Sequence, residues 1–166
     1  MVTREGTAAS IDRVWDVLGR IQDPEIPVVS LVDLGIIREV TVEGSAVTVR
    51  MTPTFAGCPA LHAMRQAVVD DLGAAGFGPV RVEIVFSPPW STDQIAPAAR
   101  EKLRSFGLTP PRVPAEAAFL HLQDPVECPR CASLETELRN AFGSTPCRTI
   151  HYCRSCQTPF EGFKPL

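Results

Sequence analysis

Two Cys-x-x-Cys pairs near the C-terminal end constrain the fold of this 166-residue chain more than any other feature. The pairs are Cys128 with Cys131 and Cys153 with Cys156. Each pair turns two sulfurs toward one point, and two such knuckles supply the four ligands of a tetrahedral site. The segment after Ala132 is too short to build a large core, so we expect a metal ion to supply much of its folding free energy. The pattern predicts a structural metal ribbon over residues 125–166.

The ligand set and the metal leave alternatives open. The spacer between the pairs is slightly longer than the usual spacer of about 15–20 residues, and it contains Cys147 and His151. Either residue is an alternative ligand to one of the four cysteines. Zinc is the expected structural metal, and iron is the alternative because four thiolates accept both. A pair of redox-active or buried thiols is the alternative to a metal site.

The first 108 residues predict a separate domain. Apolar residues at helical spacing predict a helix that Ser10 caps and that ends by Gln22, because Pro24 follows. Two β-branched segments around a Gly-containing turn predict a hairpin, and a second helix is expected to begin at Pro59. The two hairpin strands are predicted at residues 36–42 and 46–52, a third strand at 80–86 and a last helix at 91–105. The order αββαβα indicates an α+β fold with a small mixed sheet, followed by the four-cysteine metal ribbon.

A run of helix-breaking residues separates the two predicted modules. Gly107 is followed by Pro110, Pro111 and Pro114, which is typical of a linker. We therefore expect an α/β domain at 1–108, a linker at 109–124 and the ribbon at 125–166.

Composition narrows the functional classes. Apolar residues make up 45% of the chain and the net charge is −3, without a basic block, so we expect no nucleic-acid partner. No apolar run is long enough for a membrane span, and the N-terminus lacks the pattern of a secretory signal. We expect a cytoplasmic protein, where the six cysteines stay reduced.

Cys58 stands apart from the other cysteines. It directly precedes Pro59 at the expected start of a helix, where free N–H groups and the helix dipole favour a thiolate. His62 follows at i+4 spacing. The alternative is that Cys58 is a buried packing residue and His62 a surface residue. The loop carboxylates are candidates to assist a metal site or are simply solvated: Asp23, Glu25 and Asp33.

Several motifs together resemble a known family. The segments 23–27 (DPEIP), 33–37 (DLGII), 52–59 (TPTFAGCP) and 87–91 (SPPWS) resemble the signature of the scaffold domain in SufT-like proteins. The segments 142–147 (FGSTPC) and 159–164 (PFEGFK) resemble the extension of the PaaD (PaaJ) family, which accompanies phenylacetyl-CoA epoxidase. The likeness covers nearly the whole chain.

The resemblance implies an accessory protein in phenylacetate degradation, without a catalytic cycle of its own. Its role would be maturation or insertion of the di-iron or iron–sulfur centres of the epoxidase. By the family pattern, Cys58 is the thiol that transfers iron or a cluster, the four paired cysteines hold the ribbon metal, and the role of Cys147 stays open. The implied partners are the epoxidase subunits and the iron–sulfur assembly machinery, with a homodimer as a hypothesis.

Two other functions compete with this interpretation. The first is a structural subunit of the oxygenase that docks or orients the other subunits through the ribbon. The second is a thiol enzyme that uses Cys58 with His62. The sequence contains no nucleophile elbow, phosphate loop or dinucleotide fingerprint that would favour a conventional enzyme.

Overall fold

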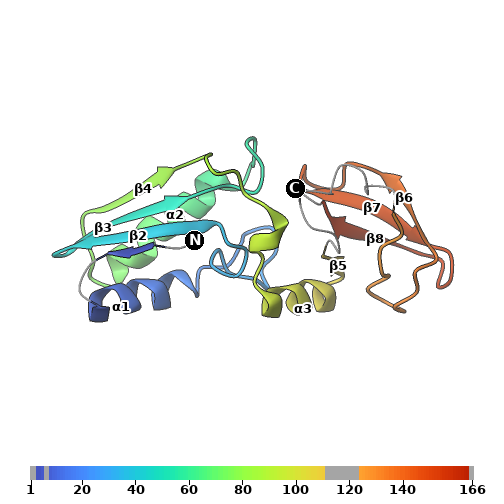
Figure 1. Cartoon of the computed structure of the whole chain (residues 1–166), viewed down its shortest axis with the longest axis horizontal. Helices are drawn as coiled ribbons and strands as arrows, with labels where there is room; N and C mark the ends of the chain where they lie inside the picture. The colour runs from blue at the N-terminus through green and yellow to red at the C-terminus, as the bar shows by residue number, and fades with distance from the viewer. Residues whose placement is uncertain (1–2, 6–7, 111–123, 165–166) are drawn as a thin grey trace. The chain divides into compact units, whose positions relative to one another are not determined.

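The computed structural model describes residues 3–5, 8–110 and 124–164. The chain divides into two compact units, an N-terminal unit (Met1–Trp90) and a C-terminal unit (Ser91–Leu166). Figure 1 shows the elements of each unit. The predicted division into domains at 1–108 and 125–166 stays a prediction, and residues 111–123 of the predicted linker lie outside the described residues.

The N-terminal unit contains a four-stranded mixed sheet. Its strands are β1 (Thr3–Glu5), β2 (Ile37–Glu43), β3 (Ala46–Met51) and β4 (Val80–Ile84), in the order β1-β2-β3-β4 (Figure 1). β2 and β3 form the predicted antiparallel hairpin, and Gly44 at φ 64° supplies the left-handed residue of its turn. β1 pairs with β2 and β4 pairs with β3, both in parallel.

Two helices cover one face of this sheet. α1 (Ala8–Leu18) contacts β2 and α2, and α2 (Leu61–Ala74) contacts β4. α2 buries Met64, Val68 and Leu72, which recur at helical spacing and are at most 1% exposed. Alternate residues of the strands point at this core, and the other face of the sheet carries polar side chains.

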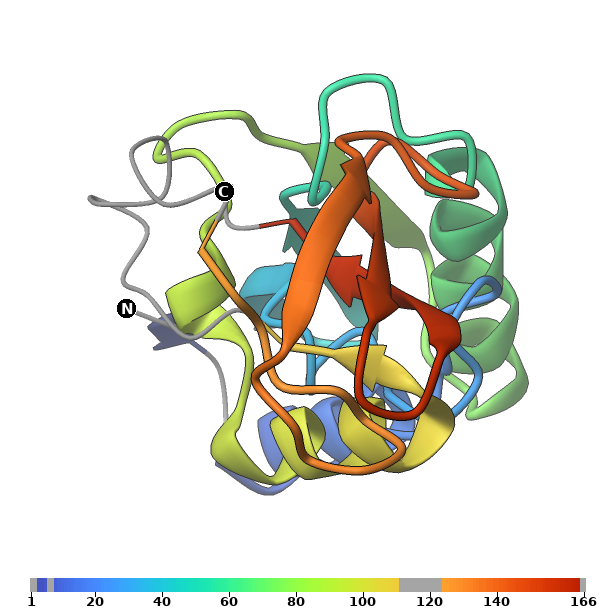
Figure 2. The same ribbon diagram turned by 90° about the vertical axis from the view of Figure 1, so that its right-hand side faces the viewer.

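The C-terminal unit begins with two short helices and ends with a second sheet. A 3-10 turn, η1 (Thr92–Gln94), precedes α3 (Pro97–Phe106). The strands are β5 (Leu108–Thr109), β6 (Thr136–Asn140), β7 (Arg148–Cys153) and β8 (Thr158–Phe163), in the order β5-β8-β7-β6. β6, β7 and β8 are antiparallel neighbours and lie side by side in Figure 2. β5 pairs with β8 in parallel.

The predicted α+β class, with the order αββαβα and a cysteine ribbon, is confirmed. Two short strands, β1 and β5, were missed because two or three residues carry no readable alternation. α1 begins at Ala8 rather than at a Ser10 cap, and it ends at Leu18 because Gly19 follows. The predicted last helix is broken before Pro97, because a proline keeps the preceding residue, Ala96, extended.

Within the described residues, no helix is both long enough and apolar enough to span a lipid bilayer.

Candidate metal centre and thiol loop

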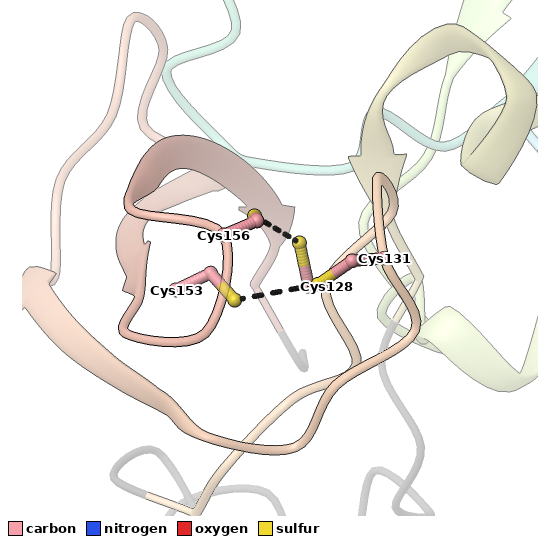
Figure 3. Close-up of side chains that lie close together, drawn as sticks. All are labelled: Cys128, Cys131, Cys153 and Cys156. Atoms are coloured by element: carbon pink, nitrogen blue, oxygen red, sulfur yellow. Dashed lines mark hydrogen bonds between the residues drawn. The ribbon is translucent and has the colours of Figure 1, made fainter.

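The structure brings the four paired cysteines together. Their sulfur atoms all lie within 4.8 Å of one another, as Figure 3 shows. Cys128 Sγ lies 3.7 Å from Cys156 Sγ, and Cys131 Sγ lies 3.6 Å from Cys153 Sγ. A tetrahedral site with Zn–S bonds of about 2.3 Å has sulfur–sulfur edges of about 3.8 Å. The spacing of the four sulfurs therefore fits a zinc-sized ion at their centre.

Both knuckles are followed by a residue with left-handed backbone. In the first knuckle, Ala132 N–H donates to Cys128 O at 2.9 Å and Cys128 N–H donates to Ser133 O at 3.0 Å. Ala132 follows the second cysteine and has φ 58°. Gln157 follows the second cysteine of the other knuckle and has φ 57°. Because neither residue is a glycine or asparagine, the usual sequence signal for left-handed backbone is missing at both turns.

The thiols of the cluster differ in their readiness to ionise. The Thr158 side chain, helped by the neighbouring thiols, lowers the pKa of Cys156 to about 7. The backbone of Ser133 acts to lower the pKa of Cys131, but burial and the neighbouring thiols raise it to about 12. Four thiols at this spacing cannot all ionise without a cation between them. A divalent metal ion would replace their protons, so metal binding is expected to release protons.

Cys147 and His151 are not part of this group of described ligands. Cys147 is 8% exposed, and its sulfur lies 3.1 Å from Thr145 Oγ1. His151 is 3% exposed, and its Nε2 lies 2.9 Å from Thr149 Oγ1. Its ring stacks on Phe160, and burial lowers the pKa of His151, so the ring is neutral at neutral pH. Both side chains are buried in the ribbon and lie outside the four-sulfur group.

Cys58 lies in the loop between β3 and α2, at the carboxyl end of β3. Two successive turns hold it: Cys58 N–H donates to Phe55 O at 3.0 Å, and Leu61 N–H donates to Cys58 O at 3.3 Å. The side chain is partly exposed. The helix begins at Leu61 and not at the predicted Pro59, because the second turn uses the Cys58 carbonyl before the helix starts. Cys58 is therefore a loop residue before the helix, accessible from solvent.

His62 does not share a helix face with Cys58. It is exposed on the first turn of α2, whereas Cys58 precedes the helix. The predicted i, i+4 relation therefore has no structural basis.

Thr52 is a residue of this region that sequence reasoning did not single out. It directly follows β3, is 1% exposed, and its N–H donates to Ile36 O at 2.9 Å. Its hydroxyl is buried and has no hydrogen-bond partner in the part of the chain that the structure describes. Buried hydroxyls normally have partners, so the Thr52 hydroxyl, without a described partner, is an exception that should cost stability.

The motif carboxylates shape the loop before β2. Asp23 Oδ1 accepts hydrogen bonds from Glu25 N–H at 2.8 Å and Ile26 N–H at 2.9 Å. Asp33 Oδ2 accepts a hydrogen bond from Ser30 N–H at 3.1 Å. The carboxylates of Asp23 and Asp33 therefore hold backbone in place, which is the ordinary role of Asp in turns.

Trp90, in the motif of residues 87–91, also has a structural role. It is 5% exposed and donates from Nε1 to Leu34 O at 2.8 Å. The tryptophan thus joins the end of the N-terminal unit to the loop that Asp33 holds.

Comparisons with known proteins match both parts of the chain. Residues 11–86 match the iron–sulfur cluster assembly protein family, and residues 114–164 match the PaaD zinc beta ribbon domain. A protein of Escherichia coli K12, described as a candidate D component of 1,2-phenylacetyl-CoA epoxidase, is 42% identical over 154 residues, which are 93% of this chain and 92% of that protein.

Two further likenesses concern the N-terminal region. An Fe–S protein maturation auxiliary factor of Porphyromonas gingivalis is 36% identical over 91 residues, 52% of this chain and 83% of that protein. A crystal structure of a domain of unknown function, DUF59, from Bacillus anthracis superposes with a TM-score of 0.52 and 27% identity. The match covers 55% of this chain and 89% of that one.

Proposed function

The chain belongs to the PaaD family of 1,2-phenylacetyl-CoA epoxidase components, and from this premise we propose that it is an accessory protein that helps to mature an iron centre of such an epoxidase. The single observation that carries the proposal is the combination in one chain of an iron–sulfur assembly domain with a four-cysteine ribbon. The relative from Porphyromonas gingivalis, described as a maturation factor, supports a maturation role for the N-terminal region of this chain.

The two cysteine sites suit two different tasks. The four ribbon sulfurs would close the coordination sphere of a structural zinc ion, so no position remains for a substrate. Cys58 would supply one sulfur ligand to iron or an iron–sulfur cluster, which is cargo and not a resident group. Because Cys58 is a single protein ligand, a partner would fill the other coordination positions of the iron or the cluster. The cargo is then held weakly enough to be passed on.

The surroundings of Cys58 fit a transfer site. The thiol lies on a loop and not in the core, and Phe55 next to it is 42% exposed. The Phe55 ring lies close to Gly57, where an added Cβ would come within 3.5 Å of it. An exposed aromatic ring beside a thiol gives a partner protein an apolar contact next to the cargo.

The direct test is anaerobic reconstitution of the zinc-loaded protein with ferrous iron and sulfide. We expect thiolate-to-iron charge-transfer absorption in the natural protein, loss of most of it in Cys58→Ala, and no change in the control Cys147→Ala. Zinc-loaded protein is used so that the ribbon thiols cannot take the iron. Unchanged absorption in Cys58→Ala would refute the assignment of Cys58.

The second candidate function is that of a docking subunit. It is favoured by two large apolar side chains exposed on the C-terminal unit, Leu134 at 50% and Phe142 at 65%. Isolation of a stoichiometric complex with the epoxidase subunits that Leu134→Ser and Phe142→Ser weaken, and that Cys58→Ala leaves intact, would favour this function over maturation.

A further inference from the structure

β4 is the edge strand of the N-terminal sheet. β3 pairs with one of its edges, and no described strand pairs with the other (Figure 1). The pairing with β3 fixes which backbone groups are used. Val47 N–H donates to Pro79 O at 3.0 Å and Val85 N–H donates to Met51 O at 2.8 Å, so the odd-numbered residues of β4 bond to β3. The N–H and C=O groups of Val80, Val82 and Ile84 therefore point to the open edge.

The sequence of β4 is self-complementary around its middle residue. The strand reads Val80-Arg81-Val82-Glu83-Ile84. In an antiparallel pair of two such strands centred on Val82, valine faces valine, Val80 faces Ile84, and Arg81 faces Glu83. Val82 has its backbone groups on the open edge, so the central pair would be a hydrogen-bonded one. The pairing then forms about six inter-strand hydrogen bonds.

Charge on the outer face of the sheet supports the same pairing. Arg50 of β3 pairs with Glu39 of β2 at 2.9 Å and with Glu83 of β4 at 3.1 Å. Glu39, Arg50 and Glu83 therefore form a row across β2, β3 and β4 in which the charge alternates, and the row ends on the carboxylate of Glu83 at the sheet edge. Arg81 is exposed and has no ion-pair partner in the described part of the chain. In the antiparallel pair, the partner's Arg81 would lie opposite Glu83 in a non-hydrogen-bonded position, where side chains approach most closely.

The inner face offers apolar surface to the same partner. A groove of about 590 Å³ follows α2, β3 and β4, and Val69, Val80 and Val82 are part of its lining. Val69, Val80 and Ile84 are only partly buried, although they lie on the core side. A strand added beside β4 would cover them.

We propose that β4 is the interface of a symmetric dimer in which two copies of this chain join their sheets, with Arg81 and Glu83 forming two reciprocal ion pairs. The interface is isologous, as a two-fold axis through Val82 requires. The antiparallel pairing places the carboxyl ends of β3 and β4 of the two copies at opposite ends of the joined sheet. The two Cys58 loops therefore do not meet, and this dimer is distinct from one that shares a cluster between two Cys58 thiols.

Sedimentation equilibrium of the full chain tests the proposal with charge reversals. We expect a dimer whose dissociation constant rises about tenfold or more in Arg81→Glu and in Glu83→Arg, because each change places like charges opposite one another twice. An equimolar mixture of the two variants restores both ion pairs and should recover the dimer. Arg20→Glu, an equal change in charge at another exposed site, and Cys58→Ala should leave the dissociation constant unchanged.

Amide hydrogen exchange gives a second, residue-specific result. The amides of Val80, Val82 and Ile84 should be protected in the natural protein and exchange faster in Arg81→Glu. The amides of Arg81, Glu83 and Val85 should stay protected in both, which shows that the variant is folded. The proposal is overturned if the natural chain remains a monomer at every concentration, if mixing the two reversals gives no dimer, or if only Cys58→Ala dissociates it.

Discussion

Replacing Cys153 by alanine should weaken metal binding by the ribbon and so make the ribbon easier to unfold. Cys153 is fully buried, and its sulfur lies 3.6 Å from that of Cys131. Structural zinc in small domains contributes about 10–16 kcal/mol, so an equal share for each of four ligands is about 2.5–4 kcal/mol. The expected loss in zinc affinity is therefore roughly 10²–10³-fold.

The ribbon has little else to replace that stabilisation. After residue 124, the described apolar side chains that are buried are Phe163 and three cysteines, of which two belong to the cluster. Complete burial of one phenylalanine contributes about 1.5–3 kcal/mol, which is much less than the metal. Loss of the metal should therefore expose β6, β7 and β8 to protease, while the N-terminal unit stays folded.

The assay is competition with a chromophoric zinc chelator, followed by limited proteolysis. Cys147→Ala is the matched control, because Cys147 is also a buried thiol of the ribbon and lies outside the cluster. We expect its zinc affinity to stay within a few-fold of that of the natural protein. Equal affinities of the Cys153→Ala and Cys147→Ala variants would refute the assignment of the ligands. A metal-free natural protein that resists protease would refute the claim that metal stabilises the ribbon.

For three further substitutions, the structure predicts whether the stability of the protein rises or falls. Thr52→Val removes the buried hydroxyl without a partner, so it should raise the free energy of unfolding by about 1 kcal/mol in thermal melts; a fall would mean that the hydroxyl is satisfied. Gly162→Ala should destabilise the ribbon by about 1–3 kcal/mol in urea, because its Cβ would lie 2.9 Å from Thr149 Oγ1; an unchanged midpoint would contradict that contact. Glu161 is partly desolvated, which acts to raise its pKa, but the Ser144 N–H and the Arg148 guanidinium lower that pKa below 4.5. A carboxyl whose pKa is lowered in the folded state stabilises the protein above about pH 4.5, and this stabilisation is lost as the pH falls through the folded pKa. Glu161→Gln should therefore lower the free energy of unfolding by about 1 kcal/mol near neutral pH and by less in acid. A difference that is constant with pH would exclude this ion pair as its source.

The sequence predicted most of the secondary structure because the signals were local. The hairpin around Gly44 and the apolar face of α2 depend on residues within one or two turns of each other. The errors also have local causes. α2 starts at Leu61 because the carbonyl of Cys58 closes an extra turn, and the last helix is interrupted because Pro97 imposes an extended residue before it.

The roles of the motif residues could be only partly predicted. Asp23 and Asp33 were candidates to assist a metal, but their oxygens accept hydrogen bonds from backbone amides. His62 had helical spacing from Cys58, but the helix does not include Cys58. Both differences depend on the local path of the backbone, which residue type alone does not reveal.

The sequence by itself determined the four-cysteine ribbon, because a Cys-x-x-Cys knuckle is a local geometry and two of them define one site. Only the tertiary structure decided that Cys147 and His151 lie outside that site, that the Thr52 hydroxyl is buried without a described partner, and that Arg81 stands at an open edge. These facts depend on which strands pair and in what order. Apart from hairpin neighbours such as β2 and β3, strand pairing joins residues far apart in the chain, and no pattern within a single segment specifies it.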